Sequence, residues 1–86
     1  MRSPAASNQL PPPLELMCLR VLWVLREANV EQVRQALFEK KPLAYTTVMT
    51  LLDRLARKGT VSRKKQGRAF VYQAQISREA LLRLAT

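Results

Sequence analysis

The 86-residue sequence has no histidine, a single cysteine and only six acidic side chains. One cysteine cannot form an intrachain disulfide, and without histidine the chain lacks the ligands of the usual Cys/His zinc site. The scattered carboxylates offer no acid–base pair and no activated nucleophile, so the sequence does not indicate an enzyme. We expect neither a metal nor another cofactor, and we expect Cys18, inside an apolar run, to be a buried inert thiol.

Long hydrophobic runs are also missing. The longest, from Leu14 to Leu25, is interrupted by Glu15 and Arg20, and it is shorter than the ~20 residues that a membrane span needs. The chain does not open with a charged-then-apolar segment and a small-residue cleavage site, which would indicate secretion. We therefore expect a cytoplasmic protein that does not cross a membrane.

Charge is dominated by one sign. Fifteen Lys and Arg against six Asp and Glu give a net charge of +9 and a pI near 10.9. Such self-repulsion does not stabilise a small domain, so it predicts a polyanionic partner. The basic residues are spread over several segments instead of lining one amphipathic helix, which favours nucleic acid over a membrane surface. The length allows one small domain with a modest core.

The segment from Ala44 to Gly59 carries the most informative pattern. Val48, Leu51, Leu52 and Leu55 recur at i, i+3, i+4 and i+7, which predicts a helix with one buried stripe. The opposite face combines short hydroxyls with guanidiniums: Thr46, Thr47, Thr50, Arg54 and Arg57. A merely solvated face is the alternative, but threonine has low helix propensity and is a poor choice for one. Because these side chains can hydrogen-bond base edges or phosphates, we interpret the face as a DNA-recognition surface.

Two further helices are expected before this one. The first begins near Pro13 and runs to about Glu27, with Leu16, Leu19, Leu22 and Trp23 as its core stripe. It is apolar nearly all round, which is more than one interior face requires. Either it is central to the domain, or part of its surface serves something outside these 86 residues.

The second helix has a start and a stop signal. Asn29 and Gln32 can form a capping box at its start, and the sequence Lys40-Lys41-Pro42 ends it after about Glu39. A short turn then leads to the threonine-lined helix. A capped helix, a short turn and a polar-faced helix are typical of a helix-turn-helix, in which the second helix enters the major groove.

After Gly59 the pattern becomes strand-like. We expect strands over 60–65 and 68–73 around a two-residue turn, Gln66-Gly67. Pairing Lys65 with Arg68 would place Val61, Phe70 and Tyr72 on the face that packs on the helices. The tip collects four cations: Arg63, Lys64, Lys65 and Arg68. A soluble hairpin whose charges protect its edges would explain them, but next to a recognition helix they indicate a wing that contacts DNA phosphates or a minor groove.

These residues resemble a known family. The run from Leu43 to Gly59, followed by Val61, Arg63 and the segment 67–72, is similar to the penicillinase-repressor family of bacterial winged-helix repressors, the BlaI/MecI/CopY group. Residues 19–23 also resemble that family's first helix, and the resemblance covers about residues 14–78. It implies a homodimer that binds a palindromic operator and represses transcription. It further implies that Thr46, Thr47, Thr50 and Arg54 face DNA, with Arg68 at a basic wing position.

The predicted fold is α+β and mainly helical: a winged helix-turn-helix over residues 13–76, with three helices and a two-stranded β-hairpin wing. Residues 1–12 are expected to be a disordered tail. Residues 77–86, with Ser77 as N-cap, are expected to begin a C-terminal helix of the dimerisation type. Family members continue further, so we expect either a DNA-binding-domain fragment or a short member. The homodimer is expected in the full-length context, with a monomer as the alternative for this chain.

The predicted function is sequence-specific repression on double-stranded DNA. Thr46, Thr47, Thr50 and Arg54 are expected at base edges or phosphates. The backbone contacts are expected from Arg57, Lys64, Lys65 and Arg68. Two alternatives stay open: a sequence-neutral architectural binder, which would explain the charge but not the threonines, and a protein-interaction module that uses the apolar surplus of the first helix.

Overall fold

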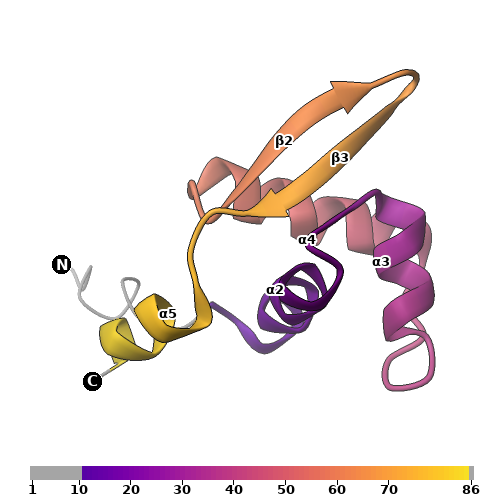
Figure 1. Cartoon of the computed structure of the whole chain (residues 1–86). Coiled ribbons are helices and arrows are strands. Elements are labelled where there is room, and N and C mark those ends of the chain that lie inside the picture. The colour runs from indigo at the N-terminus through magenta and orange to yellow at the C-terminus, as the bar shows by residue number, and fades with distance from the viewer. Residues whose placement is uncertain (1–10, 86) are drawn as a thin grey trace, which may run out of the picture.

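The computed structural model describes residues 11–85 (Figure 1). Its elements, in chain order, are α2 (Pro13–Leu25), β1 (Glu27–Ala28), α3 (Val30–Leu37), α4 (Tyr45–Arg57), β2 (Val61–Gln66), β3 (Ala69–Ala74) and α5 (Arg78–Ala85). Of the expected tail over 1–12, residues 1–10 lie outside the described residues. The chain therefore alternates helices with a small sheet, and α2, α3 and α4 with the β2–β3 hairpin form a winged helix-turn-helix.

Three helices enclose the core. The largest fully buried side chains are Leu19 and Leu22 of α2, Val33 of α3, and Leu52 and Leu55 of α4. All lie on the apolar stripes that the helical period predicts, so burial of these stripes holds the three helices together.

Trp23 lies at the edge of the core, although we expected it within the core stripe of the first helix. It is only half-buried, as is Leu16, and both lie against the edge of the core. The indole Nε1 of Trp23 donates to the carbonyl oxygen of Ile76 at 2.8 Å. Because an indole N–H needs a hydrogen-bond partner when it leaves water, this side chain joins α2 to the segment before α5 instead of filling the centre.

The end of α2 differs from the expectation. The helix stops at Leu25, two residues before Glu27, because Arg26 adopts a positive φ of 75° and its N–H bonds back to the Leu22 carbonyl at 2.8 Å. Glu27 and Ala28 then pair with β3 as a short strand. The expected two-stranded wing is therefore part of a three-stranded sheet. A two-residue strand is too short to show a period in the sequence.

The capping box at the start of α3 is confirmed. The Gln32 N–H donates to Asn29 Oδ1 at 2.8 Å, and the Asn29 N–H donates to Gln32 Oε1 at 2.9 Å. On the outer side of α3, Arg34 donates to Glu31 and thereby lowers the pKa of that carboxyl. The helix ends at Leu37, earlier than the expected Glu39, and a turn leads into α4.

The sheet is antiparallel in the order β1-β3-β2. Its hairpin register differs by two residues from the expected one: Lys65 lies opposite Phe70, not Arg68. The turn residues are Gly67, with a φ of 66°, and Arg68. A shift of two keeps every side chain on its expected face, so Val61 and Tyr72 are buried as predicted.

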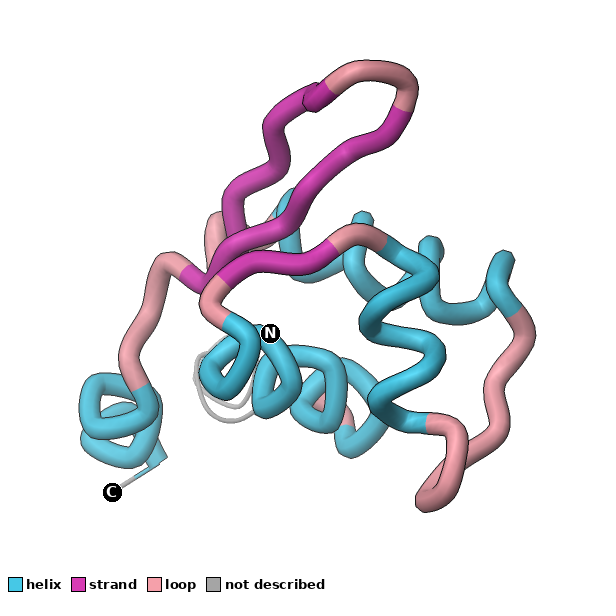
Figure 2. Tube along the Cα trace, turned by 45° about the vertical axis from the view of Figure 1, so that its right-hand side comes forward, coloured by secondary structure: helices cyan, strands magenta, loops and turns pink. Residues whose placement is uncertain are grey.

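The far half of the hairpin extends beyond the helices, as the tube in Figure 2 shows. Phe70 lies on this part and is 41% exposed, so it does not pack into the core as expected. The helix expected after Ser77 is present as α5, and the Ser77 hydroxyl accepts from the Ala80 N–H at 3.0 Å. Within residues 11–85, no helix has the length and apolar character needed to cross a membrane.

Candidate nucleic-acid interface

The polar face of α4 is exposed to solvent. Packing of Val48, Leu51, Leu52 and Leu55 against the core turns the opposite side of the helix outward. All five predicted residues of that face are exposed: Thr46, Thr47, Thr50, Arg54 and Arg57. The hydroxyl Oγ1 of Thr50 already donates a hydrogen bond within the helix, to the carbonyl oxygen of Thr46 at 3.0 Å. The oxygen of this hydroxyl can still accept a hydrogen bond, and the methyl group of Thr50 remains available for apolar contact.

The arginines of α4 differ in their surroundings. Arg54 is exposed and forms no ion pair within residues 11–85. Arg57 lies 3.3 Å, through Nε, from Oδ2 of Asp53, yet its side chain is 80% exposed. An ion pair this open to solvent is weak, so the Arg57 guanidinium can leave Asp53 for a phosphate at little cost.

Three predicted wing cations remain exposed. Lys64 and Lys65 lie on β2 and Arg68 lies in the turn, and none of the three has an ion-pair partner in the part of the chain that the structure describes. Their positive charge is therefore not neutralised locally. Together with the α4 face they give two positively charged surfaces on neighbouring elements, an arrangement suited to a polyanion.

Arg63, which we expected among the tip cations, is held by the protein itself. Its Nη1 donates to Oδ1 of Asp53 at 3.1 Å, and its guanidinium carbon lies 4.5 Å from the centre of the Phe70 ring. The carboxylate and the ring together hold the guanidinium on β2 against α4. Arg63 thus links the wing to the helix, a role that the sequence did not indicate because Asp53 is ten residues away.

A second link that the sequence did not indicate joins α4 to α2. The Lys58 ammonium lies 2.8 Å from Oε1 of Glu15, whose side chain is only 3% exposed. The only signal in the sequence for this ion pair was the position of Glu15 inside an apolar run. Close by, burial first and the Glu15 charge second raise the pKa of the Cys18 thiol to about 11. Cys18 is fully buried and protonated at neutral pH, as expected of an inert thiol.

Apolar side chains also reach the surface between α4 and the wing. Tyr45 and Met49 of α4 and Phe70 of β3 are 49%, 42% and 41% exposed, and together with Arg68 they line part of a cavity of about 210 Å³. The sequence contained a signal for the first two, since they lie one turn apart and outside the buried stripe of α4. Within residues 11–85, no group of three or more His, Cys, Asp or Glu side chains is placed to hold a metal ion.

Comparison with known sequences finds relatives for most of the chain. The family model described as "Penicillinase repressor" matches residues 12–86. The chain is 41% identical over 70 residues to the transcriptional regulator BlaI of Mycobacterium tuberculosis, covering 80% of this chain and 51% of the relative. It is 34% identical over 62 residues to the penicillinase repressor of Bacillus licheniformis, covering 72% and 48%. The chain therefore spans about half the length of the curated relatives it matches.

Solved structures show the same fold. The DNA-binding domain of the repressor BlaI superimposes with a TM-score of 0.73 at 28% identity, over 93% of both chains. The monomeric form of Bacillus licheniformis BlaI, solved in complex with the blaP half-operator, superimposes with a TM-score of 0.68 at 29% identity, over 85% of this chain and 89% of that one. A structure of the CopR repressor gives a TM-score of 0.62 at 37% identity, over 72% and 90%.

Proposed function

The chain belongs to the penicillinase repressor family, and on that premise we propose that it is a bacterial transcriptional repressor that reads a palindromic operator. In this proposal α4 lies in the major groove and the wing contacts the DNA backbone. The protein acts in the cytoplasm, catalyses no reaction and needs no cofactor. The relative solved with a half-operator supports the assignment of double-stranded DNA as the partner.

The observation that carries this proposal is the exposed threonine–arginine face of α4 next to three wing cations that form no ion pair within residues 11–85: Lys64, Lys65 and Arg68. Three short hydroxyl side chains let the helix approach base edges closely, and a sequence-neutral binder would gain nothing from them. We assign base-edge or nearby phosphate contacts to Thr46, Thr47, Thr50 and Arg54. We assign backbone contacts to Arg57, Lys64, Lys65 and Arg68.

In this proposal residues 13–76 form the DNA-binding unit. Residues 1–12 lie outside this unit, and residues 77–86 begin a helix of the dimerisation type. In the full-length protein a homodimer would place two copies of α4 on the two halves of the operator. Without that linkage each half-site is bound separately, so this chain alone is expected to bind weakly.

The proposal is tested by selecting a dyad-symmetric site from random duplexes. Binding to the selected site and to a scrambled duplex of equal length is then measured at one salt concentration, for this chain and for the chain fused to a dimerising helix. A specificity ratio of ~10³ or more for the fusion is expected, since specific binders reach that range. A ratio near one for both proteins, with a steep salt dependence, would instead identify a sequence-neutral binder.

Single substitutions test the assigned residues. Thr47→Ala or Arg54→Ala is expected to reduce the discrimination between operator and scrambled DNA by ~1–3 kcal/mol. Arg68→Ala is expected to weaken binding to both duplexes alike and to reduce the slope of log K against log salt by about 0.9. Equal losses on both duplexes for Thr47→Ala and Arg54→Ala would show that these side chains do not read the sequence.

A further inference from the structure

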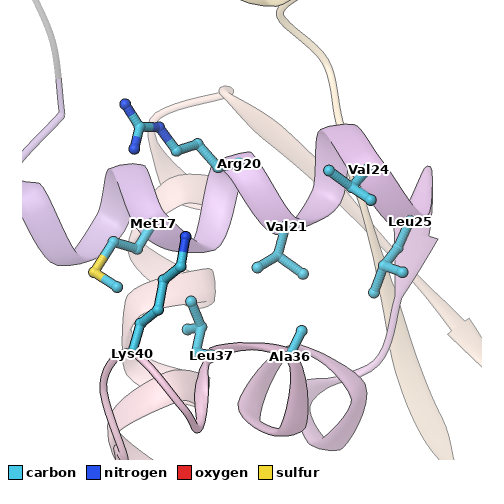
Figure 3. Close-up of a pocket in the computed structure, with 8 residues that line it drawn as sticks. All are labelled: Met17, Arg20, Val21, Val24, Leu25, Ala36, Leu37 and Lys40. Carbon is cyan, nitrogen blue, oxygen red and sulfur yellow. The ribbon is translucent and has the colours of Figure 1, made fainter.

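An apolar groove of about 280 Å³ runs between α2 and α3 (Figure 3). Val21 of α2 and Ala36 and Leu37 of α3 line its middle, Val24 and Leu25 lie at one end, and Met17 lies at the other end. Val24 is 79% exposed and Leu25 is 42% exposed. The groove therefore presents Val24 and Leu25 to solvent, next to the half-buried Met17 and Val21 and above Leu37, which belongs to the core.

These side chains account for the apolar surplus of α2. The helix buries Cys18, Leu19 and Leu22 in the core. The residues at 17, 21, 24 and 25 form a second stripe with the helical spacing i, i+4, i+7 and i+8. Met17 and Val21 of this stripe are half-buried against the core, whereas Val24 and Leu25 remain exposed within residues 11–85. The exposed end of the stripe is the part that a partner outside these residues could cover.

Two cations border the groove at the end away from Val24. Arg20 extends from α2, and Lys40, from the turn after α3, reaches toward α2 beside Met17 (Figure 3). Neither forms an ion pair in the described range 11–85, and no acidic side chain lines the groove. We propose that the groove binds an amphipathic helix of a partner protein, with apolar residues seated on Val21 and Val24 and carboxylates paired with Arg20 and Lys40.

The dimensions of the groove suit a helix. From Met17 to Leu25 the stripe rises roughly 12 Å along α2, about two helical turns. A partner helix that lays its residues i, i+3 or i+4, and i+7 along this distance would pack ridges into the groove as α2 and α3 pack on each other. The groove lies between two helices, so it offers no unpaired strand edge to an extended peptide.

A second copy of this chain is a poor occupant. In a two-fold contact each copy brings the same surface to the interface, so two Arg20 and two Lys40 side chains would enter it with no acidic lining residue of the groove to pair with them. Each copy also carries a net charge of +9. Like charges brought together in one interface oppose association, whereas an acidic helix neutralises them. Charge complementarity therefore selects an acidic partner.

The groove and the candidate DNA surface lie on different sides of the molecule. The buried stripe of α4 packs on α2 and α3, and α4 passes behind α2 in Figure 1. The threonine–arginine face of α4 therefore points away from the groove. A partner helix and DNA can occupy the same molecule together, and the proposal does not depend on DNA binding.

The test is a displayed library of helical peptides, about 18 residues long because isolated helices shorter than ~12–15 residues are marginal. The library is selected on the 86-residue chain and counter-selected on Val24→Asp. The matched control is Leu82→Asp, which places the same charge on an exposed leucine of α5, outside the groove. Retained DNA binding and an unchanged circular-dichroism spectrum show that Val24→Asp is folded.

The expected survivors are amphipathic peptides with Asp or Glu beside the apolar face. Their affinity should fall about tenfold or more with Val24→Asp and with Arg20→Glu, because central anchors carry most of the binding free energy, and should not change with Leu82→Asp. Basic or uncharged survivors, or none after counter-selection, would overturn the proposal. It would also be overturned if ultracentrifugation showed a dimer of the wild-type chain that Val24→Asp abolishes, since a second copy would then be the occupant.

Discussion

Neutralising Asp53 is expected to make the chain bind DNA more tightly and less selectively. The carboxylate holds two arginines: Oδ1 lies 3.1 Å from Nη1 of Arg63, and Oδ2 lies 3.3 Å from Nε of Arg57. It is the only acidic residue of α4, the helix that carries the candidate recognition face. Asp53→Asn removes one negative charge from this surface and releases both guanidiniums to seek phosphates.

The magnitudes follow from exposure. The Asp53 side chain is 33% exposed, Arg63 41% and Arg57 80%. Exposed ion pairs contribute about 0.2–1 kcal/mol each, so the loss of both pairs should lower the free energy of unfolding by about 0.4–2 kcal/mol. Each arginine that turns to a phosphate should steepen the slope of log K against log salt by about 0.9. Loss of the Asp53–Arg63 link also loosens the wing against α4, so operator and scrambled DNA should be discriminated less well.

The assay is a fluorescence-anisotropy titration of both duplexes from about 50 to 200 mM salt, the range in which phosphate contacts dominate the change in affinity. Glu79→Gln is the matched control, because it removes the same charge from the exposed first turn of α5. We expect Asp53→Asn, and not Glu79→Gln, to steepen the slope and to raise the affinity for scrambled DNA. Equal slopes for the two variants would refute the view that Asp53 holds these arginines back from DNA.

Three further predictions concern stability. Lys58→Met leaves the buried Glu15 carboxylate without its partner and should lower the free energy of unfolding by ~1–3 kcal/mol, as measured by urea denaturation. The loss is smaller than for a fully buried pair because Lys58 is half exposed. The double variant with Glu15→Gln should recover part of the loss. The pKa of Cys18 is raised to about 11 in the folded chain, so between about pH 9 and 11 the unfolded chain loses the thiol proton while the folded chain keeps it. The free energy of unfolding should therefore decline over this range by up to ~3 kcal/mol. Cys18→Ala should remove that part of the decline, and the same slope in both proteins would argue against a perturbed thiol. Trp23→Phe loses the hydrogen bond to the Ile76 carbonyl and should cost about 0.5–1.5 kcal/mol in thermal or urea unfolding; an unchanged midpoint would show that the bond contributes nothing.

Local signals in the sequence determined the helices. The stripe of Val48, Leu51, Leu52 and Leu55 defined α4 and its buried side, because a helical period relates residues within two turns. The Asn29–Gln32 capping box was equally visible, since its two members are three residues apart. The polar face of α4, and hence the candidate DNA surface, followed directly from the same period.

The tertiary structure alone decided how these elements are joined. The hairpin register depends on which two residues form the turn. We expected Gln66 and Gly67 in the turn, whereas the turn residues are Gly67 and Arg68. Strand β1 exists only because β3 supplies hydrogen-bond partners for Glu27 and Ala28.

The two roles furthest from expectation are those of Arg63 and Lys58. Both were visible as cations, but their partners Asp53 and Glu15 lie 10 and 43 residues away in the chain. The sequence does not distinguish a Lys or Arg that binds a DNA phosphate from one that pairs with a carboxylate of its own fold. Periodicity and capping act within a few residues and could therefore be predicted, whereas the pairing of charges, the sheet register and the open groove between α2 and α3 arise only when distant segments meet.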